Sequence, residues 1–145
     1  MITKRTVAAA SLAALLSAAS VAAHHAFSAE FDASKPVKLR GKVVKIELIN
    51  PHSWIHVDVK GPDGKIENWA IEAGSPNILL RRGITKGTLK IGQKIVVDGY
   101  QSKDGSRRAN GRDLTLPDGT KLFLGSSGTG APYEVQRPGV DTDTK

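Results

Sequence analysis

The segment from Val37 to Ile49 most constrains the fold, because its apolar alternation changes face midway. Apolar residues occupy alternate positions up to Val43, and the alternation then restarts one position out of step at Val44. A strand has a side-chain period of two, so a shift of one residue indicates a β-bulge. Gly41 lies just before the shift and permits a sharp bend. A long first strand that bends in this way is typical of small closed barrels.

Further strand-like segments follow, separated by turn signals. The expected strands span 53–60, 66–72, 94–100, 109–116 and 121–124. A short helix is expected between the third and fourth strands, with Ser75 as its cap, Pro76 at its first position and Gly83 after its end. This order predicts an all-β fold, specifically an OB-fold-like five-stranded Greek-key barrel. A β-sandwich is the alternative, but its seven strands are hard to find in the sequence.

The first 23 residues have the pattern of a secretory signal peptide. Lys4 and Arg5 precede an alanine-rich, weakly apolar run, and Val21-Ala22-Ala23 fits the small-x-small cleavage rule. The run is too short and too rich in alanine to predict a membrane span. We therefore expect an exported bacterial protein, periplasmic or secreted after cleavage, with no membrane span.

The expected organisation after the leader is one domain with two flanking segments. An extended N-terminal arm at 24–36 should dock through Phe27 and Phe31. The OB-like barrel should occupy 37–124. Residues 125–145 are rich in Gly, Ser, Thr and Pro, which predicts a disordered C-terminal tail.

Composition limits the chemistry available. The chain has no cysteine, which excludes disulfides, thiolate metal sites and thiol catalysis. It has 21 Lys and Arg against 14 Asp and Glu, and this basic balance favours anionic partners. We expect the partner to be a metal ion or a small anionic or glycan ligand, with no nucleic acid bound, and we expect a monomer.

All four histidines of the chain lie between positions 24 and 56, as His24, His25, His52 and His56. Histidine is the commonest metal ligand, and imidazole suits copper, zinc and nickel. Cleavage after Ala23 would put His24 at the N-terminus, where its amine and imidazole can chelate one copper ion. Cleavage one residue earlier would place His25 third, which is the spacing of the amino-terminal copper and nickel chelate. The alternative is a solvated tail and two surface histidines.

The spacing of His52 and His56 limits how they can share an ion. Four residues of a straight strand span about 13 Å, too far for one ion with ligand bonds of about 2 Å. Either the chain bends at 51–53, or only one of the two joins the N-terminal pair. We therefore expect a copper site that combines the N-terminal histidines with His52 or His56.

A second interpretation is a binding module without metal or catalysis, for a glycan, peptide or protein partner. OB-folds commonly bind through the face of strands two and three. Here that face offers Trp54, Asp58 and Asn68 as ligand-binding residues, next to a basic loop at 103–108. Catalysis is less favoured. His56 and Asp58 could pair a base with a carboxylate, but no nucleophile motif or glycine-rich phosphate loop accompanies them.

Several separated motifs occur together in one order. They are His24-His25-Ala26-Phe27, Phe31-Asp32, Gly41-Lys42-Val43, Asn50 to Ile55, Asn68-Trp69, Pro76 to Gly83 and Leu114 to Gly119. With these motifs the chain resembles domain of unknown function family 6152, a family of short exported bacterial proteins. The resemblance covers roughly residues 24–126. It implies export and a single small β domain, and it implies no activity.

Overall fold

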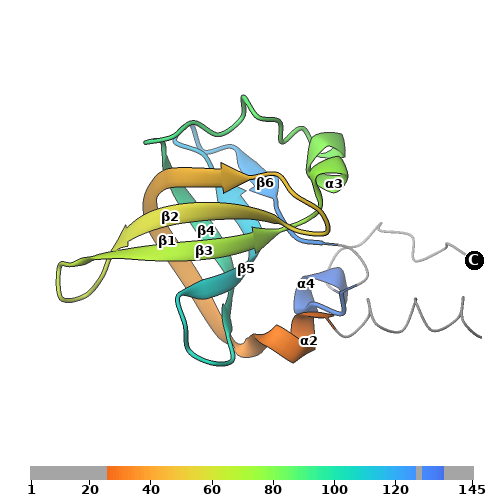
Figure 1. Cartoon of the computed structure of the whole chain (residues 1–145), viewed down its shortest axis with the longest axis horizontal. Coiled ribbons are helices and arrows are strands. Elements are labelled where there is room, and N and C mark those ends of the chain that lie inside the picture. The colour runs from red at the N-terminus through yellow and green to blue at the C-terminus, as the bar shows by residue number, and fades with distance from the viewer. Residues whose placement is uncertain (1–25, 127–128, 136–145) are drawn as a thin grey trace, which may run out of the picture.

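One long strand, β1 (Phe31–Glu47), organises the structure, a computed structural model that describes residues 26–126 and 129–135. It pairs antiparallel with β2 on one side and β4 on the other. The other strands are β2 (Ser53–Lys60), β3 (Ile66–Ala73), β4 (Lys94–Ser102), β5 (Arg108–Thr115) and β6 (Lys121–Phe123). Three short helices, α2 (Ala26–Glu30), α3 (Pro76–Arg81) and α4 (Pro132–Val135), complete the described chain (Figure 1). The protein is therefore all-β, as predicted.

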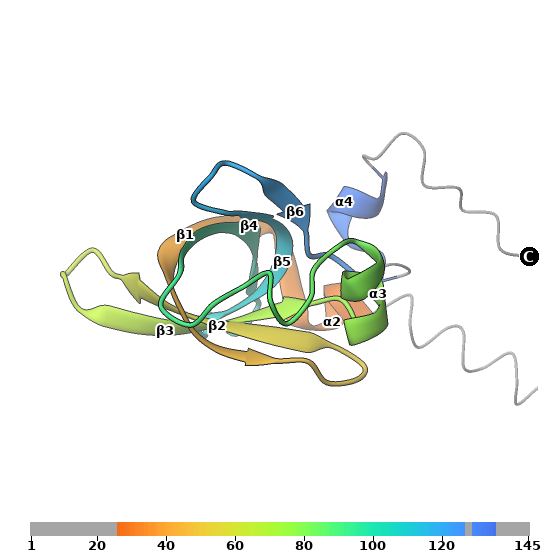
Figure 2. The same cartoon turned by 90° about the horizontal axis from the view of Figure 1, so that it is seen from above.

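The strands form one sheet in the order β3-β2-β1-β4-β5-β6. An additional parallel pairing joins β3 to the first half of β5, so the five strands from β3 to β5 close into a ring (Figure 2). The second half of β5 pairs instead with the short β6. One edge of β5 thus serves two partners, and the ring surrounds the main core.

The predicted break in β1 is confirmed. The register between β1 and β2 shifts between Val43 and Lys45. Val43 is fully buried, whereas Val44 is 38% exposed. Because of the extra residue, the even-numbered Ile46 turns toward the core after the bulge, whereas the odd-numbered Val43 does so before it. The change of phase in the sequence indicates this switch.

The core has the composition that the alternation predicts. Five apolar residues at alternating strand positions are at most 3% exposed: Ile55, Val57, Ile71, Ile95 and Val97. Trp69 also belongs to this core, and its indole N–H reaches the Glu67 carboxylate at 3.2 Å. The side of β2 that carries Ile55 and Val57 therefore faces the interior of the ring.

Helix α3 forms where the capping signals place it. The Ser75 hydroxyl accepts a hydrogen bond from the Ile78 backbone N–H at 3.4 Å, and Pro76 occupies the first turn. Gly83 follows the helix with a φ of +79°, a conformation that glycine adopts without a Cβ penalty. Leu79 anchors the helix in the core.

The N-terminal arm docks through both phenylalanines, as expected, but it is not a single extended segment. One helical turn, α2, precedes a strand that begins at Phe31 rather than at Val37. Pro36 pairs with Tyr100 of β4, so the strand continues through a polar stretch that the apolar pattern does not mark. Phe27 and Phe31 are 3% and 1% exposed and belong to a second apolar cluster, in which the Phe27 ring contacts both Phe31 and Tyr100.

The C-terminal segment differs from the prediction of a disordered tail from residue 125. Residues 129–135 pack against the sheet, and Ala131 and Tyr133 are buried in the second cluster. The Glu134 carboxylate accepts hydrogen bonds from the backbone N–H groups of Thr129 and Gly130, both at 3.0 Å. Burial of Tyr133 and this turn fix the segment despite its polar composition. Residues 127–128 and 136–145 lie outside the described residues.

No helix in the part of the chain that the structure describes is long and apolar enough to cross a membrane. The predicted signal peptide at 1–23 lies outside the described residues.

Ser53 presents a test of the core at the start of β2. Its side chain is fully buried, and its hydroxyl has no hydrogen-bond partner among the described residues. A buried, unsatisfied hydroxyl costs about 1–3 kcal/mol of desolvation. We expect Ser53→Ala to raise the free energy of unfolding by about 1 kcal/mol, measured by urea denaturation.

Ser102 provides the matched control for this prediction. It is equally buried, but its hydroxyl donates to Asp104 at 2.7 Å. Ser102→Ala should therefore lower the free energy of unfolding. If Ser53→Ala lowers it by a similar amount, the Ser53 hydroxyl has a partner and the prediction is wrong.

Candidate functional site

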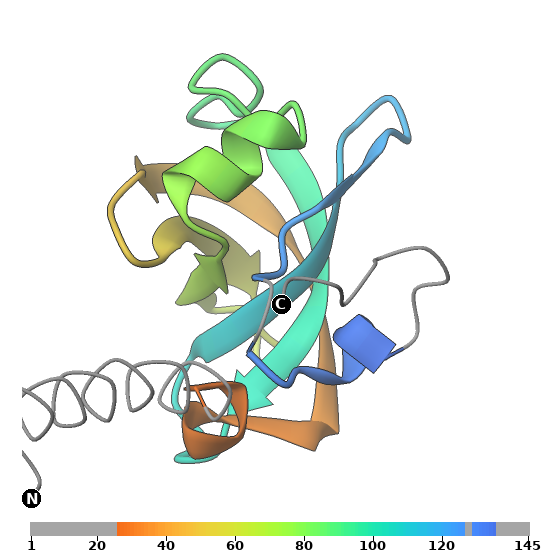
Figure 3. The same cartoon turned by 90° about the vertical axis from the view of Figure 1, so that its right-hand side faces the viewer.

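His52 belongs to the connection between β1 and β2. This connection runs at the end of the molecule where α2, α3 and α4 lie (Figures 1 and 3). The His52 Nδ1 is 3.6 Å from a carboxylate oxygen of Glu72 and 3.4 Å from the Ser126 hydroxyl. The side chain is 27% exposed, so part of the ring remains open to solvent. His52 thus joins the end of β3 to the segment that follows β6.

Glu72 is the buried carboxylate at this place, only 7% exposed. Burial raises its pKa above the usual range, because removal from water disfavours the charged form. The nearby His52 and a hydrogen bond donated by the Asn110 side chain at 3.2 Å act in the opposite direction. The Glu72 carboxylate therefore has two polar partners among the described residues, the His52 ring and the Asn110 amide.

A hydrogen-bonded chain continues from Glu72 into the C-terminal segment. The Tyr133 hydroxyl donates to the Asn110 side-chain oxygen at 2.9 Å, and both residues are nearly inaccessible to solvent. Burial raises the pKa of Tyr133 to about 12, so this hydroxyl stays protonated at physiological pH. The hydrogen bond from Tyr133 fixes the orientation of the Asn110 amide. It thereby directs the Asn110 amide N–H toward the Glu72 carboxylate.

Arg108 ties the N-terminal arm to the same end of the sheet. Its guanidinium forms an ion pair with Glu30 of α2. The guanidinium carbon also lies 5.1 Å from the centre of the Trp54 ring, in a cation–π contact. Trp54 is half-buried, and one of its neighbours across the sheet is Glu72. The predicted ligand-binding tryptophan is thus partly covered by an arginine of the protein itself.

The predicted basic loop at 103–108 is engaged within the fold. The Lys103 ammonium donates to the Ser28 carbonyl, and its backbone N–H donates to the Glu30 carbonyl at 2.9 Å. Arg107 forms an ion pair with Glu67 at 3.0 Å. These contacts hold the N-terminal arm and the β2–β3 hairpin in place.

His56 belongs to a different cluster. Its Nε2 lies 2.7 Å from Glu47 of β1, and Lys45 pairs with the same carboxylate at 2.8 Å. A hydrogen bond from Lys45, and to a smaller extent one from His56, lowers the pKa of Glu47 below its usual range. The described chain is a regular strand from Ser53 onward, so no bend brings His56 back toward His52.

Asp58 and Asn68 lie together at the other end of β2 from Trp54. They are register partners, and the Asn68 amide donates to the Asp58 carboxylate at 2.9 Å. Four residues of strand separate Asp58 from Trp54, a span of about 13 Å. Trp54 therefore lies apart from the pair formed by Asp58 and Asn68.

Within residues 26–126 and 129–135, no group of three or more His, Asp and Glu side chains could hold a metal ion. His24 and His25 lie outside the described residues. Of the four predicted metal ligands, the structure therefore describes His52 and His56 only, and it places them in separate pairs with Glu72 and Glu47.

Sequence reasoning missed Glu72, Asn110 and Tyr133. Glu72 shares its parity with Asn68 and Ala70, so the alternation alone would place it on the outward face. It is buried because the segments before β1 and after β6 cover that end of the face. The one available signal is Tyr133, an aromatic residue in an otherwise polar tail.

The comparison with protein families matches residues 11–111 to the family described as Family of unknown function (DUF6152). The chain belongs to this family, which confirms the resemblance seen in its motifs. The matched range ends before the Leu114–Gly119 motif. The comparison with curated proteins finds no match.

Proposed function

We propose that the protein is an exported copper-binding protein that combines its N-terminal histidines with His52 on an OB-type barrel. The observation that carries the proposal is the docking of the N-terminal arm beside the pair formed by His52 and Glu72. Export and cleavage after Ala23 or Ala22 are part of the proposal, because they create the free N-terminus.

The topology supports an OB-type barrel as the scaffold. Five strands close through the parallel pairing of β3 with β5, and α3 lies between β3 and β4 in the chain. That combination is the one expected of an OB-fold. The role of the barrel here is to hold the β1–β2 connection and the two terminal segments at one end.

The position of the arm supports His52 as the ligand that the fold supplies. The Phe27 backbone N–H donates to the Thr129 carbonyl at 3.3 Å. Thr129 is three residues from Ser126, whose hydroxyl contacts His52. Covalent geometry keeps the Cα of residue 25 within about 8 Å of the Phe27 Cα, and that of residue 24 within about 11 Å. His24 and His25 are thus close enough in the sequence to the docked Phe27 for the proposed site to include them.

The surroundings of His52 also suit a ligand. Its Nδ1 faces the Glu72 carboxylate, which leaves Nε2 for a metal ion. Histidine ligands in metalloproteins usually direct their other ring nitrogen to a carboxylate or carbonyl, which fixes the tautomer and the ring orientation. His56 has a similar carboxylate partner, but Lys45 places a positive charge on the same carboxylate. That charge disfavours a cation beside His56.

The test is a copper titration of protein exported and processed by its native host. Intact mass first establishes whether the chain begins at His24 or Ala23. We expect one copper ion per chain, with at least about tenfold weaker binding in His52→Ala, a loss of the size seen when metal sites lose supporting residues. A version with several residues added before the native N-terminus should bind more weakly still, because neither N-terminal chelate can then form.

His56→Ala is the matched control, because it removes the other carboxylate-paired histidine and should leave the copper affinity unchanged. Equal binding by His52→Ala and the unmodified protein would contradict the proposed shared site. In that case copper would be held by the N-terminal chelate alone, or not at all.

A further inference from the structure

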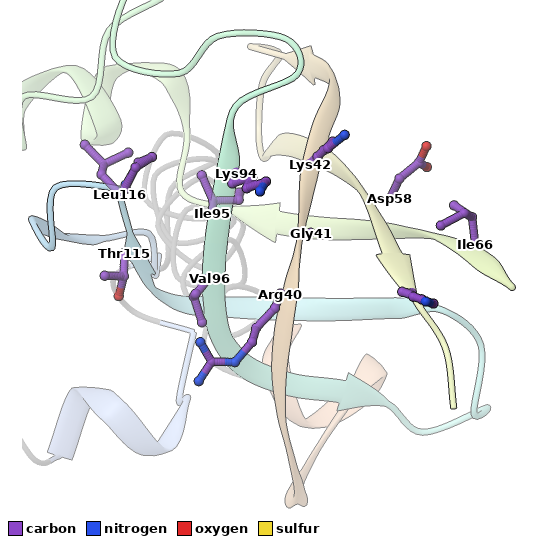
Figure 4. A pocket seen from close by; sticks show the side chains of 12 residues that line it. Arg40, Gly41, Lys42, Asp58, Ile66, Lys94, Ile95, Val96, Thr115 and Leu116 are labelled. Carbon is purple, nitrogen blue, oxygen red and sulfur yellow. The ribbon is translucent and has the colours of Figure 1, made fainter. Parts of the chain in front are cut away.

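A groove of about 700 Å³ is lined by residues of β1, β2, β3 and β4 and by the end of β5 with the turn after it (Figure 4). Its rim carries four basic side chains from three adjacent strands: Arg40, Lys42, Lys60 and Lys94. Asp58 is the single carboxylate in its lining. The volume is in the range of pockets that hold small organic molecules.

The basic side chains are placed at a cost to the sheet. Lys42 and Lys94 are register partners on β1 and β4. Like charges directly opposite each other in an antiparallel pair are destabilising. On the same two strands, Lys38 is the register partner of Asp98 and forms an ion pair with it at 2.9 Å. Opposite charges can therefore face each other across β1 and β4. The register pair of Lys42 and Lys94 instead places two positive charges side by side.

These charges are not neutralised by the protein. Among residues 26–126 and 129–135, no ion pair involves any of the four basic residues of the rim. Asp58 lies opposite Lys42 in the register, but its carboxylate accepts a hydrogen bond from Asn68 instead. The groove therefore presents a concentrated positive charge to whatever enters it.

The rest of the lining is mainly apolar. It includes Ile66, Ile95, Val96, Leu116 and Pro117. Ile66 is 64% exposed, although Trp69, Ile71 and Ala73 of the same strand are buried. An ion alone would use only the cations, whereas a molecule with an anionic head and an aliphatic body would use both parts of the groove.

We propose that this groove binds a single small amphiphilic anion, with its phosphate, sulfonate or carboxylate head between Lys42, Lys94 and Arg40 and its aliphatic body along the apolar lining. No histidine lines the groove, so the proposal does not depend on metal binding. The proposed ligand is a single molecule taken from solution, not a membrane surface.

Isothermal titration calorimetry with octyl phosphate, kept below its aggregation concentration, tests the proposal. We expect one molecule to bind per chain, more tightly than inorganic phosphate or octyl glucoside, and less tightly as salt concentration rises. Replacing both register partners, as Lys42→Gln with Lys94→Gln, should weaken binding by about fivefold or more. Lys86→Gln is the matched control, because it removes one positive charge in the exposed loop before β4 and should change nothing.

Folding of the double variant is checked by its melting temperature, which should stay the same or rise because a like-charge pair is removed. Unchanged affinity in the folded double variant would overturn the proposal. Equal affinity for inorganic phosphate and octyl phosphate would also overturn it, because the apolar lining would then play no part. Binding to anionic vesicles without binding to monomeric octyl phosphate would assign the groove to a membrane surface instead.

Discussion

Val57→Asp should unfold the protein or lower its free energy of unfolding by more than about 4 kcal/mol. Val57 is fully buried in the middle of β2, between Val43 of β1 and Trp69 of β3. An aspartate there would bury a carboxylate in an apolar core, and an unpaired charge in such surroundings is very costly. Domains of this size have a total stability of about 5–15 kcal/mol, so a loss of this size leaves little folded protein.

Val44→Asp is the matched control, because it makes the same chemical change on the exposed side of the bulge. Val44 is 38% exposed, and its carboxylate would remain in water. Urea denaturation followed by circular dichroism should show a nearly unchanged midpoint for Val44→Asp. A normal midpoint for Val57→Asp would mean that β2 does not face the core in this register.

The strands are predictable from the sequence wherever one face is buried and the other is not. The alternation of Ile55 and Val57 with polar residues marks β2 with its observed bounds, and the change of phase at Val43 marks the bulge. The first part of β1 escapes the same reasoning. Its residues 32–35 are polar or small, and they lie in a register irregularity between Phe31 and Pro36, the two flanking residues that pair with β4.

The C-terminal segment could not be predicted from composition. Gly, Ser, Thr and Pro lower the average hydrophobicity of residues 125–145, and that average predicts disorder. Two residues decide otherwise. Tyr133 fills the space above Gly125, where a Cβ would lie only 2.6 Å from the Tyr133 ring, and Ala131 is fully buried beside it. The burial of these two side chains orders residues 129–135, although the average hydrophobicity of residues 125–145 is low.

The candidate site was predictable by residue type but not by arrangement. Histidines in a chain that is predicted to be exported and has no cysteine point to metal ligands, and this reasoning selects His52 and His56 equally. Only the fold separates them, because the terminal segments cover the end of the sheet near His52 and bury Glu72 there. Their packing depends on contacts between residues far apart in the chain, such as Ser126 with His52, which no local pattern encodes.

Gly41→Ala should lower the free energy of unfolding by about 3 kcal/mol, the upper part of the range for overpacking a close contact. A Cβ at Gly41 would lie 2.2 Å from the Asp58 carbonyl oxygen and 2.7 Å from a methyl group of Val57. The first of these atoms belongs to the backbone, so β2 itself would have to move away from β1. Glycine is therefore required here by the close approach of two strands.

Gly87→Ala is the matched control, since the nearest atom to a Cβ there is the Thr85 hydroxyl oxygen at 3.7 Å. It should leave the free energy of unfolding within about 0.5 kcal/mol, or raise it slightly by restricting the unfolded chain. Gly41 also lies between the two β1 cations of the groove, so movement of β2 should displace Lys60 relative to Lys42. Gly41→Ala that still folds should thus weaken octyl phosphate binding, whereas unchanged stability and unchanged binding together would show that β1 and β2 do not approach so closely.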